Sequence, residues 1–158
     1  MTVSTSNLIG VSLGYTDTSP AFNVGTVVNL DDGGQAIYVQ AASTVATYAA
    51  VAVRVNNTVV PLTTTNSAGS KAVGFAQVSI ASASYGWVQI GGKPVVKLAA
   101  SCLPAVPLYT TATAGTLDDA VVSGGLVAGI VALTTASGAT ALTCVAGYPH
   151  VLTGVAGT

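Results

Sequence analysis

Apolar residues along this chain come in short runs, and glycine, asparagine or proline ends most of them. Valine and threonine dominate the runs, as is typical of β-strands. The 3.6-residue spacing and the capping residues of helices are nearly absent. The pattern therefore predicts an all-β protein. The predicted strands are Val24–Leu30, Gln35–Ala41, Ala50–Val55, Thr58–Thr63, Ala72–Ile80, Tyr85–Ile90, Pro94–Ala99, Leu126–Leu133 and Ala139–Ala146.

The first part of the chain lacks this alternation. Gly10, Gly14 and the turn Asp17–Pro20 interrupt residues 1–24 repeatedly. We expect an extended N-terminal arm that orders on a partner, or else a mobile terminus without a role. A single β-domain is expected over residues 25–158, either a compact β-barrel or β-tulip or a sandwich of short antiparallel strands.

Two features of the pattern leave alternatives open. Residues 43–50 are rich enough in alanine for a short helical turn, yet they lead directly into the strand-like Val51–Val53. The segment Gly25-Thr26, with Leu30–Asp32 after it, loosely echoes Gly115–Asp119. This echo indicates either two related β-modules or a chance match in a biased composition.

Two residue pairs predict tight hairpins, because Asn56-Asn57 and Gly91-Gly92 can both supply the positive φ of a primed turn. Directly paired residues share a face of the sheet, so the second hairpin predicts one core face and one opposite face. The core face would carry Tyr85, Trp87, Val96 and Leu98. The opposite face would carry Val88, Ile90, Val95, Lys93 and Lys97. We expect this second face to be half covered by a neighbouring subunit, or to be an ordinary solvated sheet face.

Charge is scarce: only 6% of the residues are charged, against roughly 25% in an ordinary soluble domain. The net charge of −1 rests on four basic and five acidic residues, too few cations to neutralise the phosphates of a nucleic acid. No apolar run approaches the roughly 20 residues of a membrane-spanning helix, and the first residues lack the features of a secretory signal. Such a surface predicts apolar area covered by other subunits.

Candidate chemistry is limited to a few side chains. His150 has no catalytic partner in a recognisable motif and is interpreted as a surface or packing residue. Asp31–Gly34 is typical of a turn, and Asp118-Asp119 lacks the alternating ligands of a calcium loop. Cys102 and Cys144 do not have the spacing of a zinc site, so we expect two buried reduced thiols, with a disulfide as the alternative. The sequence predicts no enzyme, no metal and no cofactor.

Several glycine-centred segments occur in a characteristic order. These are Val73–Gln77 (VGFAQ), Tyr85–Ile90 (YGWVQI) with Gly92, Pro107–Thr110 (PLYT), Ala114–Asp119 (AGTLDD) and Gly129-Ile130, preceded by Gly25, Asp32-Gly33 and Tyr38-Val39. The succession resembles the small capsid decoration (cement) proteins of tailed bacteriophages, and it covers residues 20–150.

The resemblance implies a β-barrel or β-tulip on the outer surface of a phage head, commonly a homotrimer that reinforces contacts between major capsid protein subunits. Residues 1–24 would be an arm along the capsid, and the particle would assemble in the host cytoplasm. No catalytic residue is implied. Two alternatives stay open: another virion component (head-fibre base, tail-tube or tail-fibre module), and a carbohydrate- or surface-binding β-sandwich that would expose Trp87.

Overall fold

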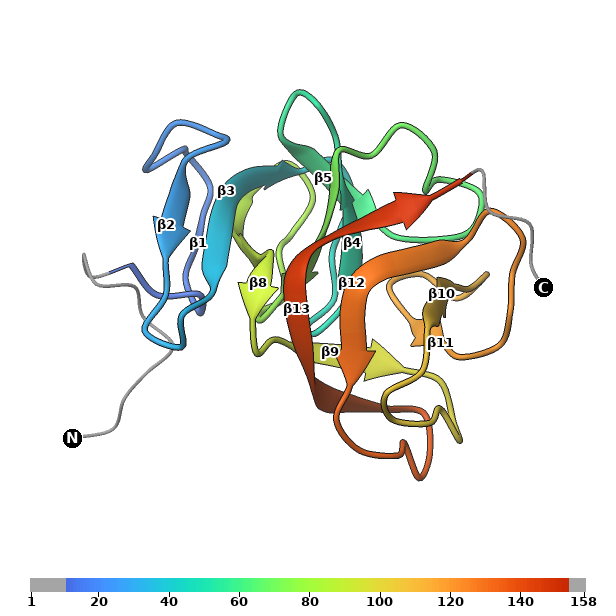
Figure 1. Cartoon of the computed structure of the whole chain (residues 1–158). Coiled ribbons are helices and arrows are strands. Elements are labelled where there is room, and N and C mark those ends of the chain that lie inside the picture. The colour runs from blue at the N-terminus through green and yellow to red at the C-terminus, as the bar shows by residue number, and fades with distance from the viewer. Residues whose placement is uncertain (1–10, 154–158) are drawn as a thin grey trace.

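The computed structural model describes residues 11–153, and every regular element among them is a β-strand (Figure 1). The predicted all-β fold is therefore confirmed. The strands are β1 (Thr16–Asp17), β2 (Val27–Asn29), β3 (Gln35–Ala41), β4 (Ala50–Val53), β5 (Thr58–Pro61), β6 (Ala72–Ala76), β7 (Tyr85–Gln89), β8 (Gly91–Gly92), β9 (Val95–Leu98), β10 (Leu108–Thr110), β11 (Leu117–Asp118), β12 (Leu126–Ala132) and β13 (Thr140–Leu152).

Five strands close into a first barrel. β3 pairs in parallel with β5, and antiparallel pairs then join β5 to β4, β4 to β6, β6 to β7 and β7 back to β3. Closure removes the free sheet edges. Alternate residues along each strand point inward, and in this barrel those side chains are aliphatic. The interior cluster is Ile37, Val39, Ala41, Val45, Ala49, Val51, Val53, Val59, Ala72, Ala76, Ile80, Val88 and Ile90.

A second barrel repeats this connectivity. β9 pairs in parallel with β11, and antiparallel pairs join β11 to β10, β10 to β12, β12 to β13 and β13 back to β9. Strands β3 to β7 thus correspond in order to β9 to β13. The register corresponds as well, since Ala41 pairs with Val59 in the first barrel as Leu98 pairs with Leu117 in the second.

The similarity between Gly25–Asp32 and Gly115–Asp119 left open two related β-modules or a chance match. The structure contains two related barrels, but these two segments are not equivalent in them. Asn57 and Gly115 both have positive φ, of 62° and 74°. Each is followed by a threonine, which begins β5 in the first barrel and directly precedes β11 in the second. Gly115 therefore corresponds to Asn57 and not to Gly25, which lies outside the first barrel, before β2.

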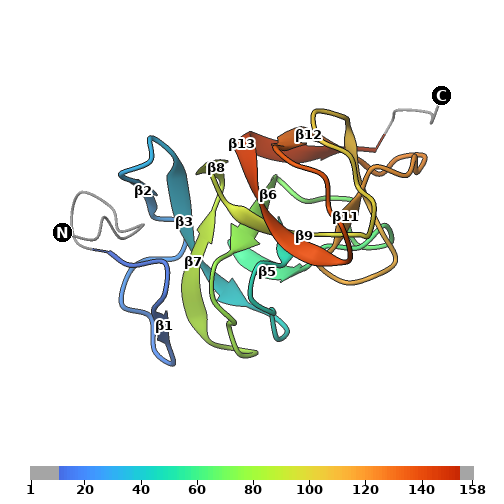
Figure 2. The ribbon, with the colours of Figure 1, turned by 90° about the horizontal axis from the view of Figure 1, so that it is seen from below.

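A continuous apolar core joins the two barrels, which lie side by side in Figure 2. Val73 and Phe75 of β6 point away from the first barrel and pack with the inward side chains of the second. At Gly115 the backbones approach so closely that an added Cβ would lie 2.5 Å from the Cβ of Ala49. The Gly115 N–H donates to the carbonyl of Leu62 at 2.8 Å. The barrels are therefore in direct contact through both side chains and backbone.

Residues 11–30, which we call the N-terminal strap, cover the outer face of the first barrel. β1 pairs with β7 and β2 pairs with β3. The apolar cluster beneath the strap contains Val11, Leu13, Val28, Leu30, Ala36, Tyr38 and Trp87, with Tyr85 packed against it. Of the arm expected over residues 1–24, residues 1–10 lie outside the described part of the chain, and residues 11–24 lie on the chain's own barrel.

The predicted hairpin at Gly91-Gly92 is wrong. β7 pairs with β1, β3 and β6, whereas β9 pairs with β11 and β13. The two glycines form β8, which crosses between the barrels and pairs with Ala146 and Gly147. Gly92 serves a close approach, since its φ is 90° and a Cβ on it would lie 2.6 Å from Asp32 Oδ2 and 2.8 Å from the Gly34 Cα.

The other local predictions hold better. A hairpin does join β4 to β5 at Asn56-Asn57, but the predicted two-residue primed turn is wrong. Val53 pairs with Val59, the Arg54 N–H donates to the Thr58 carbonyl at 2.9 Å, and only Asn57 of the two asparagines has positive φ. Residues 43–50 contain no helix and reach β4 through turns. Asp31–Gly34 forms the predicted turn, between β2 and β3, where the Leu30 N–H donates to the Gly34 carbonyl at 2.8 Å.

Candidate interaction surfaces

The face predicted to meet a neighbouring subunit does not exist as a surface. Val88 is 0% exposed and Ile90 is 1% exposed, because both point into the closed first barrel. Val95 and Lys97 are half-buried on β9 in the second barrel, and Lys93 is exposed just before it. The predicted pairing of β7 with β9 is wrong, because β7 pairs with strands of the first barrel and β9 pairs with strands of the second.

The predicted core residues are buried, but in two places. Trp87 lies under the strap with the half-buried Tyr85 beside it, and Val96 and Leu98 lie inside the second barrel. Trp87 is 2% exposed and so cannot stack on a sugar ring without the strap moving.

Aromatic packing fastens the strap. The Phe22 ring lies 5.4 Å from that of Tyr38 and 5.3 Å from that of Trp87, both edge-on, a favoured geometry. The Tyr38 hydroxyl donates to Asp17 Oδ2 at 2.7 Å and accepts from the Ala21 N–H at 3.1 Å. Burial, together with the Asp17 hydrogen bond, raises the pKa of Tyr38 to about 12. The phenol therefore stays protonated and keeps donating at neutral pH.

Large apolar side chains that remain exposed in the described chain gather at its two ends. On the strap they are Tyr15, Phe22, Val24 and Val27. On the second barrel they are Leu103, Val121, Val131, Leu133, Val145 and Tyr148. Val55, in the loop between β4 and β5, is exposed as well.

The second group includes a continuous sheet surface. Val131 of β12 pairs directly with Val145 of β13, and these side chains are 38% and 40% exposed. A shallow open depression of about 390 Å³ lies beside them, lined also by Gly129, Ile130, Ala146 and Gly147. We call the outward surface of β9, β12 and β13 the barrel-2 face. Because contiguous exposed apolar surface marks interaction sites, this face is a candidate for contact with another chain.

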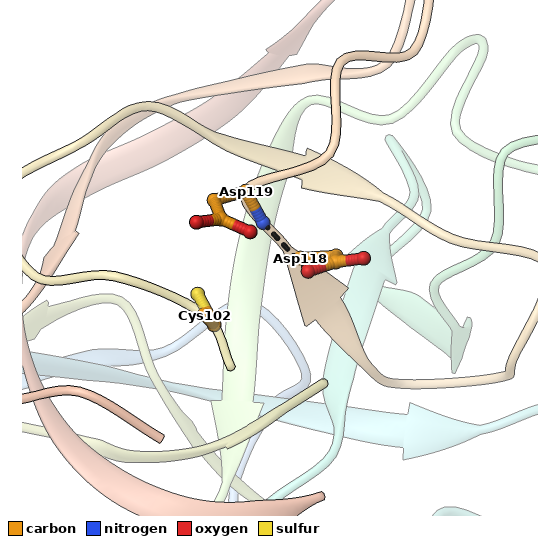
Figure 3. Close-up of side chains that lie close together, drawn as sticks. All are labelled: Cys102, Asp118 and Asp119. Carbon is orange, nitrogen blue, oxygen red and sulfur yellow. Dashed lines mark hydrogen bonds between the residues drawn. The ribbon is translucent and has the colours of Figure 1, made fainter. Parts of the chain in front are cut away.

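Three potential metal ligands lie close together where β11 ends at Asp118. The ligand atoms of Cys102, Asp118 and Asp119 all lie within 4.8 Å of one another (Figure 3). Burial, and then the charges of Asp119 and Asp118, raise the pKa of the Cys102 thiol. Asp119 Oδ2 accepts the Leu103 N–H at 3.0 Å, and Asp118 Oδ1 accepts the Asp119 N–H at 2.9 Å. These bonds give the carboxylates a structural role, fastening the loop at Leu103 to β11.

Both cysteines are buried and unbonded. Burial raises the pKa of Cys144 to about 12, so the reactive thiolate is scarce at pH 8. We expect neither thiol to react with Ellman's reagent at pH 8 in the folded protein, and two thiols per chain to react in denaturant. A Val55→Cys variant, with its side chain at a highly exposed position, is the positive control. Rapid reaction of the folded wild type would show that the core opens readily.

Sequence reasoning missed the polar residues that hold the barrels together. The Gln77 amide donates to the Val95 carbonyl at 3.1 Å and accepts the Val95 N–H at 3.2 Å. Gln89 Nε2 donates to Asp32 Oδ2 at 3.0 Å, and the same carboxylate oxygen accepts the Lys93 N–H at 3.0 Å. Both glutamines belong to the glycine-centred segments that the sequence analysis singled out. Those segments did not indicate that the glutamine side chains form these hydrogen bonds.

Comparison with family models, with curated proteins and with solved structures finds no match. His150 is exposed, and its Nδ1 lies 3.5 Å from the Tyr148 carbonyl oxygen. Within residues 11–153 no helix is long and apolar enough to cross a membrane.

Proposed function

We propose that this protein is a capsid decoration protein of a tailed bacteriophage. It binds the outer surface of the head as a homotrimer and stabilises contacts between major capsid protein subunits. The observation that carries the proposal is the ordered succession of segments from VGFAQ to AGTLDD, which resembles that class of protein.

The places of these segments in the fold agree with a shared architecture. VGFAQ forms β6 and supplies both the inter-barrel Phe75 and the bridging Gln77. YGWVQIGG forms β7 and β8, and AGTLDD forms the close approach at Gly115 and strand β11. The segments therefore lie where the two barrels join, which gives their succession in the sequence a structural reason.

The surface chemistry suits binding at many equivalent sites. With 6% charged residues, the protein has few ion pairs to offer a partner, and its exposed apolar side chains supply contact area instead. On an icosahedral lattice, weak contacts repeated many times give high overall avidity.

The test is to mix purified protein with bare expanded capsids of the phage that encodes it. We expect saturable binding whose affinity changes less than about tenfold between low and moderate salt. Salt screens interactions between charges, and this protein has few charged residues. Decorated capsids should also resist heating better than bare ones. Absence of both binding and heat protection would reject the proposal, and binding to isolated tails alone would favour the alternative of a tail component.

A further inference from the structure

The repeated topology allows the outer faces of the two barrels to be compared position by position. On the first barrel, Tyr38 of β3 pairs with Trp87 of β7. Tyr38 lies three residues before Ala41, and Val95 lies three residues before its counterpart Leu98. Val95 pairs with Thr143 of β13. The pair Val95 and Thr143 therefore corresponds to the pair Tyr38 and Trp87.

The two corresponding faces differ in what covers them. Over the first barrel lies the strap, which leaves Tyr38 and Trp87 buried. On the second barrel Thr143 is exposed and Val95 is half-buried. The neighbouring Val145 is exposed too. Within the described chain, the second barrel thus presents the kind of face that the first barrel keeps covered.

The strap has an apolar outer surface of its own. Tyr15 is 73% exposed, and Phe22, Val24 and Val27 are each more than a third exposed. The strap lies at one end of the molecule in Figures 1 and 2, and the second barrel lies at the other. Because the strap is already packed on its own first barrel, it can reach a barrel-2 face only on another copy of the chain.

Charge also favours contact between these two unlike surfaces. The strap carries Asp17 and no lysine or arginine, and the exposed Asp31 follows it directly. The barrel-2 face carries Lys97, which lies beside Ala141 at its margin, and no aspartate among its outward residues on β9, β12 and β13. Two identical barrel-2 faces would bring lysines together, whereas strap against face brings opposite charges together.

We propose that the strap of one copy packs on the barrel-2 face of the next copy, through Tyr15 and its apolar neighbours against Val131 and Val145. Such a head-to-tail contact uses two different surfaces, so it generates a ring where the rotation closes. A ring of three copies matches the homotrimer of the proposed function, on which this number rests. The contact needs no capsid, so the two proposals can fail separately.

Light scattering on purified full-length variants tests the contact. We expect a wild-type species near three times 15.4 kDa, and at least a tenfold weaker association for both Tyr15→Asp and Val145→Asp. Val55→Asp, at a position that is 79% exposed and not among the proposed contact residues, is the matched control and should assemble as wild type does. Circular dichroism checks that every variant is folded.

Mixing the two variants distinguishes the geometry. Tyr15→Asp keeps an intact barrel-2 face and Val145→Asp keeps an intact strap, so the mixture should form a heterodimer that neither variant forms alone. A Tyr15→Asp variant that still dimerises by itself would show that two barrel-2 faces meet instead. A monomeric wild type at about 100 µM, a concentration at which a micromolar contact is nearly saturated, would overturn the proposal.

Discussion

Val88→Asp is expected to prevent folding of the protein. Val88 is fully enclosed in the first barrel, and a Cβ placed on the facing Gly74 would already lie 2.7 Å from one of its methyl groups. A carboxylate there has no water and no cationic partner among the interior residues of that barrel. Burying an unpaired charge costs on the order of 4–5 kcal/mol or more, comparable to the whole stability of a small domain. The measurement is soluble yield and circular dichroism.

Val55→Asp is the control, because it places the same charge on an exposed valine that lies outside the barrel interior and is not one of the proposed contact residues. Its effect on the free energy of unfolding should stay within about 0.5 kcal/mol, as for most surface substitutions. If Val88→Asp folded with wild-type thermal stability while Val55→Asp did not, the assignment of inside and outside would be wrong.

Phe75→Ala is expected to uncouple the two barrels and to cost about 3–5 kcal/mol, the usual range for truncating a buried phenylalanine. Phe75 belongs to the first barrel by its strand but packs with the interior of the second. Trp87 is the only tryptophan and lies on the first barrel, so its fluorescence reports that barrel, whereas circular dichroism reports both. The two signals should coincide during urea unfolding of the wild type and separate in the variant.

An exposed truncation, Leu133→Ala, provides the comparison and should leave both transitions unchanged within error. Coincident transitions in Phe75→Ala with a loss below about 1 kcal/mol would mean that the shared core does not couple the barrels, since loss of a buried aromatic side chain normally costs several times more.

Local patterns predicted the longer strands because alternation and valine content are properties of neighbouring residues. The strands at Gln35–Ala41 and Leu126–Ala132 were found almost residue for residue. β1, β10 and β11 were missed, since two or three residues are too few to show a period. β10 and β11 exist as parts of the closed second barrel, and β1 exists through its pairing with β7, so in each case other strands supply the hydrogen bonds.

The candidate surface could not be predicted from the same information. Gly91-Gly92 satisfies the local rule for a hairpin, yet the backbone of Gly34 approaches it from a distant turn. With the pairing wrong, Val88 and Ile90 were assigned to a surface. Val131 and Val145 lie in predicted strands, but only the closed barrel shows that both point outward.

The repeat was hidden for a similar reason. The two barrels share connectivity and register while their sequences share few identities, because many small apolar residues can fill a five-stranded interior. Asn57 and Gly115 occupy one position of the repeat through the same positive φ, although they are different residue types. Equivalent positions could be recognised only from strand pairing.

The central claim, decoration of a phage head, is tested most directly by cryo-electron microscopy of capsids incubated with the purified protein. We expect added density on the outer capsid surface, in groups of three. The two-barrel chain should fit each copy, with the strap of one copy against the barrel-2 face of its neighbour. Capsids that remain bare at saturating protein, or density found only on tails, would contradict it.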